Sequence, residues 1–376
     1  MEAYLDNSAT TPLCPEAVDA VNAALVSFWG NPSSLYSVGI DAAKMLDNSR
    51  HEIASKLSCR DDEIYFTSGG TEGNNLAVFG AAHALRRRGK RIVISSIEHP
   101  SIDEAAKKLE TEGFEVVRVP VDENGRIIER DLFRAVTGDT VLVSIMIVNN
   151  EVGTIQPVEL ARRAVMSARS PALVHCDAVQ AFGKLKIKPV NLGVDLMTLS
   201  SHKIHGPKGA GALYVRKGVT ISPRTYGGAQ ENKLRPGTEP VPNIAGFAAA
   251  ASVLPDVQSG YQRAEALRDY LIAGLSSIDS VIVNSPSDAL PYVTNVSVMG
   301  LRSETMLNLL SSRGVYVSSG SACSKGKKSR VLKAMGLSDA RIDSALRISF
   351  SRYTNTEHID MLIDGLAECR KRVRGR

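Results

Sequence analysis

The sequence has no long hydrophobic run, and this excludes a membrane-spanning helix. Its longest apolar stretch, residues 244–254, is much shorter than the roughly 20 residues that a helix needs to cross a bilayer. The residues up to Thr11 contain no basic and apolar leader, so we expect no targeting peptide. The 376 residues, 43% of them hydrophobic and 23% charged, are typical of a globular protein with one large and one smaller domain.

Cysteine is scarce. The five cysteines are odd in number and widely separated, and no C-x-x-C pair occurs among Cys14, Cys59, Cys176, Cys323 and Cys369. The pattern therefore indicates neither a disulfide framework nor a zinc site, and we expect no metal. It favours a reducing, cytoplasmic location, where a single thiol can carry chemistry.

The chain also has no G-x-G-x-x-G run, which argues against a nicotinamide-dependent dehydrogenase. Its net charge is +5, and much of the positive charge lies in residues 370–376. Such an arm binds nucleic acid or an acidic partner in some proteins, and in others it is a solvated tail. Because no aromatic residue interrupts these charges, we expect no direct nucleic-acid partner.

Short β-like runs alternate with helical ones from Glu63 to Val215. Strands are expected at 64–67, 91–95, 115–119, 141–145, 172–174, 194–199 and 212–215, and helices near 74–88 and 101–112. This rhythm predicts an α/β fold with a mostly parallel mixed sheet covered by helices. Ligands of such sheets bind beyond the carboxyl ends of the strands.

The rest of the chain predicts a second, smaller α+β domain. A helical pattern runs from Pro242 to Ile278, and strands and helices alternate from Tyr292 to Arg370. We therefore expect a large cofactor-binding domain over 15–255 and a small C-terminal domain over 256–376, joined by the N-terminal segment 1–14.

Lys203 follows one of the predicted strands, with Ser200, Ser201 and His202 beside it. A lysine that is buried near other cations can lose its proton near neutral pH and form a Schiff base. Asp177 and Gln180 follow another strand, where a carboxylate suits a pyridine nitrogen and an amide suits a ring hydroxyl. The alternative is that Lys203 is an ordinary loop cation; together, the motifs favour a pyridoxal phosphate site.

Three further loops at strand ends have two interpretations each. Thr71, in a glycine-containing strand-to-helix turn, either contacts a phosphate or caps the helix. His99 either stacks on a planar cofactor and shuttles protons as a catalytic residue, or it is a surface residue. Asn150 either binds a ring substituent or a substrate carboxylate, or it caps a turn.

The chain resembles the cysteine desulfurase family, a branch of the class V aminotransferases with the type I fold of pyridoxal phosphate enzymes. The matching runs cover nearly the whole chain in the family's order: Tyr4–Thr11, Gly30–Ser34, Phe66–Asn75, the segments around His99 and Asn150, Asp177, Gln180, Lys203, Arg235–Glu239 and Ser319–Cys323.

The resemblance implies a role for each candidate residue. Lys203 would form the Schiff base with pyridoxal 5'-phosphate and remove a proton from the substrate, while Asp177, Gln180 and His99 would bind the ring. Asn150 would contact cofactor and substrate. The implied phosphate ligands are Thr71, Ser200, His202 and, from the second subunit of a homodimer, Thr238. Arg347 matches the arginine that binds the substrate carboxylate, for which a guanidinium fork is better suited than lysine.

Cys323 lies among small residues that are followed by cations, which favours a mobile thiolate. The other four cysteines fit buried structural positions. The resemblance implies that the Cys323 thiolate attacks the sulfur of L-cysteine, leaving L-alanine and a persulfide. The sulfur would pass to an acceptor protein for iron–sulfur cluster, thio-cofactor or tRNA synthesis. Two alternatives stay open: a selenocysteine lyase or other class V lyase or aminotransferase, and a catalytically weak scaffold for sulfur-transfer proteins.

Overall fold

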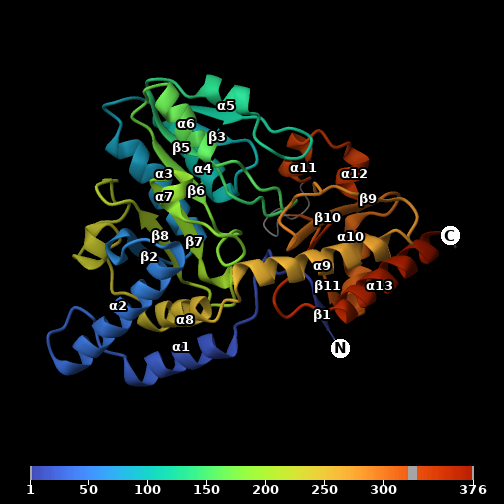
Figure 1. Cartoon of the computed structure of the whole chain (residues 1–376), viewed down its shortest axis with the longest axis horizontal. Coiled ribbons are helices and arrows are strands. Elements are labelled where there is room, and N and C mark those ends of the chain that lie inside the picture. The colour runs from blue at the N-terminus through green and yellow to red at the C-terminus, as the bar shows by residue number, and fades with distance from the viewer. Residues whose placement is uncertain (1, 321–327, 375–376) are drawn as a thin grey trace.

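The computed structural model describes residues 2–320 and 328–374, and its largest feature is a seven-stranded sheet (Figure 1). The strand order is β2-β8-β7-β6-β5-β3-β4. Only β8 runs antiparallel to its neighbours, so the predicted mixed, mostly parallel sheet is confirmed. The strands are β2 (Ile64–Thr67), β3 (Arg91–Ser95), β4 (Glu115–Val119), β5 (Thr140–Ser144), β6 (Leu173–Asp177), β7 (Leu196–Ser200) and β8 (Gly211–Val215).

Successive side chains of these strands point to opposite faces, and each face has its own hydrophobic core. Val93 packs in one core and its neighbour Ile94 in the other. Helices α3 (Gly70–Ala84) and α4 (Pro100–Thr111) cover one face. The core of the other face includes residues of α1 (Pro15–Ser27), α2 (Ser37–Leu57), α5 (Glu129–Ala135), α6 (Glu159–Ser167) and α8 (Val241–Ser252).

A smaller antiparallel sheet, in the order β12-β10-β9, lies toward the C-terminus. The long helix α9 extends toward it and packs along α13, near which the C-terminus lies (Figure 1). Strand β1 (Ala3–Tyr4) pairs with β11 (Val315–Tyr316), which brings the N-terminus to this part of the molecule. The remaining elements are α7 (Pro189–Leu192), α9 (Val257–Leu275), β9 (Val281–Val283), β10 (Val293–Val298), α10 (Ser303–Ser312), α11 (Arg330–Ala334), α12 (Asp339–Asp343), β12 (Ala345–Ser349) and α13 (Thr356–Arg374).

The division into domains of 15–255 and 256–376 stays a prediction, and several predicted elements are shifted. Helix α3 begins at Gly70, four residues before the predicted start. The helical pattern from Pro242 to Ile278 forms two helices, α8 and α9, because the chain leaves helical geometry around Pro255. Within the described ranges, no helix combines the length and apolar character needed to span a membrane.

Candidate active site

The carboxyl ends of the parallel strands border a cavity of about 240 Å³. Nearly all the site residues predicted from the sequence line it: Thr71, His99, Asn150, Asp177, Gln180, Ser200, His202, Lys203 and Arg347. The cavity therefore lies where ligands of α/β sheets bind. Its wall also includes residues without a predicted role: Ser8, Ala9, Gly70, Asn74, Met146, Val148 and Val179.

Lys203 ends a short 3-10 turn, Ser201–Lys203, that follows β7 directly. Its Nζ donates hydrogen bonds of 2.6 Å to the carbonyl oxygens of Ser8 and Ala9. Burial, followed by the positive charges of Arg347 and Lys184, lowers the pKa of the Lys203 amine to about 7. An amine with this pKa is available as a nucleophile and a base near neutral pH.

Asp177, the last residue of β6, is buried. Its Oδ2 accepts a 2.7 Å hydrogen bond from Asn74 Nδ2, and its Oδ1 accepts one of 2.9 Å from the backbone N–H of Val179. Asn74 also donates to Ser101 Oγ at 2.9 Å. The carboxylate therefore has a fixed orientation in the cavity wall.

His99 caps α4 and lines the cavity. Its Nδ1 accepts a 3.1 Å hydrogen bond from the backbone N–H of Ser101, which leaves the proton of a neutral ring on Nε2. Burial lowers the pKa of His99, so the neutral ring is favoured. Its place in the cavity wall favours the ring-stacking interpretation over a surface residue.

The start of α3 forms another corner of the cavity. Gly69 is the N-cap residue, so the interpretation of Thr71 as the cap is wrong; Thr71 lies inside the first turn and lines the cavity. The hydroxyl of Ser200 is buried and has no hydrogen-bond partner within the described ranges. His202 Nδ1 lies 3.1 Å from Thr10 Oγ1, and burial lowers its pKa to about 4. Backbone N–H groups at a helix start and an unpaired hydroxyl suit an anion.

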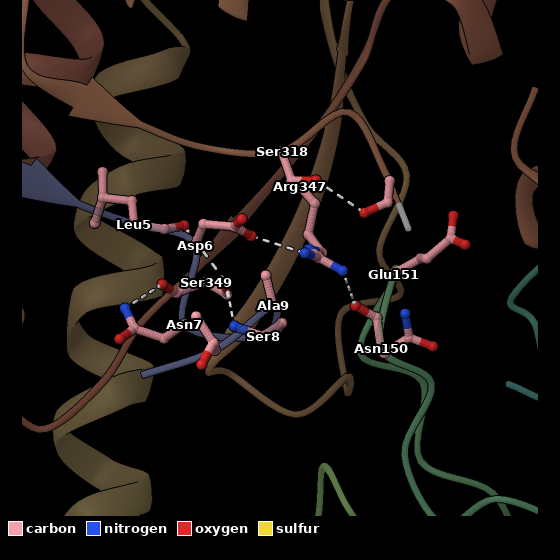
Figure 2. Close-up of polar contacts among 12 residues, drawn as sticks. Leu5, Asp6, Asn7, Ser8, Ala9, Asn150, Glu151, Ser318, Arg347 and Ser349 are labelled. Atoms are coloured by element: carbon pink, nitrogen blue, oxygen red, sulfur yellow. Dashed lines mark hydrogen bonds and ion pairs between the residues drawn. The ribbon is translucent and has the colours of Figure 1, made fainter. Parts of the chain in front are cut away.

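Arg347 lies in β12 and is 1% exposed. Figure 2 shows its guanidinium between Asp6 and Asn150. Its Nη2 forms a 2.7 Å ion pair with Asp6 Oδ1, and its Nη1 donates to the carbonyl of Asn150 at 3.1 Å. Its Nε is buried without a partner among the residues that the structure describes. Asp6 and Asn150 thus hold the guanidinium from two sides, with N–H groups left for a ligand.

Comparison with known proteins agrees with this geometry. The family model for class V aminotransferases matches residues 3–362. A cysteine desulfurase IscS of Methanosarcina thermophila is 40% identical, over 99% of this chain and 92% of that protein. The chain belongs to the class V aminotransferase family, in its cysteine desulfurase branch.

Solved structures of the branch have the same fold. A NifS-like protein superposes with a TM-score of 0.93 at 38% identity, covering 99% of this chain and 100% of that one. The structure described as SspA in complex with cysteine has a TM-score of 0.83 and 32% identity, covering 94% of this chain and 100% of that one. The predicted type I fold is therefore confirmed.

Class V aminotransferases depend on pyridoxal 5'-phosphate, and the cavity fits this cofactor. It combines a weakly basic lysine for the aldehyde, a buried carboxylate for the ring nitrogen, and an unpaired hydroxyl beside a helix start for the phosphate.

The described part of the chain does not place two predicted desulfurase residues in this cavity. Thr238 is exposed and is not among the lining residues. Cys323 lies outside the described residues, so its predicted role as sulfur acceptor stays a prediction. Of the other four cysteines, all unpaired, Cys14, Cys176 and Cys369 are buried as predicted, and Cys59 is partly buried.

Three groups in or beside the site have no role predicted from the sequence. Asn74 lies within the predicted glycine-containing turn, and its place one helical turn after Gly70 was a usable signal. The carbonyls of Ser8 and Ala9 reach Lys203 through a contact of very long range, for which the local sequence has no signal. Lys184 follows Gln180 by four residues and is 8% exposed, although lysine is rarely buried.

Proposed function

We propose that this protein is a pyridoxal 5'-phosphate-dependent cysteine desulfurase that converts L-cysteine to L-alanine and transfers the sulfur to Cys323 as a persulfide. One observation carries the proposal: Lys203, with a pKa of about 7, shares a cavity with the carboxylate of Asp177 and the guanidinium of Arg347. The relatives named cysteine desulfurase and the likeness to a structure in complex with cysteine support the choice of substrate.

Each side chain then has a defined task. Arg347 would bind the cysteine carboxylate through its free N–H groups, with Asn150 beside it. The unprotonated amine of Lys203 would accept the Cα proton of the substrate. When bound, the cofactor supplies an electron sink for the carbanion formed at Cα. Asp177 would keep the ring nitrogen protonated, Gln180 would hold the ring oxygen, and His99 would lie against the ring. Thr71, Ser200 and His202 would bind the phosphate.

The sulfur step needs a nucleophile in addition to these groups. The Cys323 thiolate would attack the substrate sulfur; an S–S bond forms and the C–S bond breaks. The carbon fragment takes up a proton and leaves as L-alanine. The persulfide then passes its outer sulfur to an acceptor, or a thiol reductant releases it as sulfide.

We also propose that the protein works as a homodimer in the cytoplasm. Trp29 and Leu35, on the loop joining α1 to α2, are 67% and 92% exposed, and Leu25, Val26 and Tyr36 nearby are also exposed. Monomers rarely expose so many large apolar side chains in one place. A second subunit would cover them and would contribute Thr238 to the phosphate.

The unpaired cysteines of the described ranges support a reducing compartment. The acceptor would be an iron–sulfur scaffold or tRNA-thiolation protein.

The deciding experiment measures alanine and sulfide release from L-cysteine with a thiol reductant. The wild type should release both products in equal amounts, and Cys323→Ser should release neither. If the variant kept full activity, a lyase without a thiol nucleophile would replace the proposal; an inactive, cofactor-loaded wild type would favour the scaffold.

A further inference from the structure

Lys184 is a buried cation that has no counter-ion in the part of the chain that the structure describes. It lies just after the turn at Gly183 and is 8% exposed. Among the residues that the structure describes, no carboxylate lies within ion-pair distance of its Nζ. Its contacts are Gln180 Oε1 at 3.5 Å and the ring of Tyr292, whose centroid is 5.8 Å away. A buried ammonium with such weak partners destabilises the fold, so its presence calls for a functional explanation.

A short bridge connects Lys184 to Lys203. Lys184 Nζ lies 3.5 Å from Gln180 Oε1, and Gln180 Nε2 donates a 3.0 Å hydrogen bond to the carbonyl of Ser8. The same carbonyl accepts a 2.6 Å hydrogen bond from Lys203 Nζ. The two lysines also line one small cavity together with Tyr292. The charge on Lys184 is therefore close enough to act electrostatically on Lys203.

We propose that Lys184 is a positioning residue for the cofactor lysine: its buried positive charge disfavours a proton on the nitrogen of Lys203, and its ammonium orients the amide of Gln180. This rests on the proposed role of Lys203 as the cofactor lysine. The lowered pKa of Lys203, to which Lys184 contributes after burial and Arg347, agrees with it. Within residues 2–320 and 328–374, the other charged or titratable groups near Lys203 are Asp6, Asp177, His99, His202, His205, Tyr292, Arg347 and Arg352.

The test follows the cofactor absorbance of the purified holoenzyme from about pH 6 to about pH 10. In Lys184→Met, the pH midpoint of the absorbance change should rise by about half a pH unit or more, because a nearby positive charge is gone. If the methionine variant does not fold, Lys184→Gln replaces it in the same measurement, with the same expected shift. Lys186→Met, which removes an exposed positive charge two residues away, should leave the midpoint unchanged.

An unchanged midpoint in both Lys184 variants would overturn the inference, as would an equal shift in Lys186→Met. Failure of the proposed function would give different experimental results. The wild type would then have no cofactor absorbance, or borohydride reduction would attach the cofactor to a residue other than Lys203.

Discussion

At the residue scale, a substitution of Arg347 tests whether binding of the substrate carboxylate requires the forked guanidinium group. Arg347→Lys keeps the positive charge but cannot hold Asp6, the carbonyl of Asn150 and a carboxylate at once. We expect the KM for L-cysteine to rise about tenfold or more, equivalent to about 1.4 kcal/mol, with a smaller change in kcat. Steady-state kinetics check this. Arg130→Lys, at an exposed arginine, is the matched control. A KM equal to that of the wild type would remove Arg347 from substrate binding.

The charge on Lys184 also predicts how stability depends on pH. Burial lowers its pKa from the usual 10.5 to about 8. Below pH 8 the ammonium is present in the folded and unfolded states, and burying it destabilises the fold. From pH 8 to 10.5 the unfolded state binds more protons than the folded state, so this destabilisation decreases as the pH rises.

Lys184→Met should therefore melt about 2–5 °C above the wild type near pH 7. The difference should become smaller toward pH 10.5, and differential scanning calorimetry measures it. Lys186→Met should show no such trend, since its side chain is exposed. A difference that is constant over this pH range would mean that the effect is packing rather than charge.

At this scale, the sequence predicted the residues that stand at strand ends but not their supporting contacts. Lys203 and Asp177 follow recognisable strands, and both lie in the cavity wall. The burial of Lys184 depends on Tyr292, more than a hundred residues away, and no local pattern encodes that contact. The same is true of Asp6, which reaches Arg347 because β1 pairs with β11 and because Asp6 itself forms a β-bridge with Ser349 of β12.

At the scale of elements, the packing of β8 against the start of α3 predicts a further effect. A Cβ atom on Gly211 would lie 2.6 Å from Gly69 Cα, and backbone cannot move away as a flexible side chain can. Gly211→Ala should displace the first turn of α3, whose N–H groups we propose as phosphate ligands. We expect weaker cofactor binding, measured as faster cofactor loss on dialysis.

Gly138→Ala is the matched control for this experiment, because a Cβ there meets only one atom, 4.0 Å away. It should retain cofactor as the wild type does. Equal retention by Gly211→Ala would show that the start of α3 does not hold the phosphate.

Helices and strands were predictable from the sequence where the pattern of apolar residues matches the pattern of buried residues. The strands β2, β3 and β4 have the bounds expected from short apolar runs before glycine or polar turns. Helices α1 and α2 were not predicted. Helix α1 exposes Val18, Leu25 and Val26, and α2 exposes Ile40, so apolar residues are not confined to the buried face of either helix.

At the scale of the whole molecule, those exposed apolar residues predict the oligomeric state. Trp29 and Leu35 lie with Val26 on α1 and the loop that joins it to α2. Burying large apolar side chains is the main favourable term in stable association. We expect sedimentation equilibrium to give a mass about twice that of the 40.3 kDa chain.

A double variant, Trp29→Asp with Leu35→Asp, places two charges in this surface and should shift the mass toward that of a single chain. Cofactor retention should fall with it, because Thr238 would no longer reach the phosphate of a partner. Val190→Asp, an exposed apolar residue of α7, should change neither quantity. A dimer that survives the double variant would mean that the subunits associate through another surface. A monomer that retains cofactor as the wild type does would mean that Thr238 is not a ligand from a second subunit.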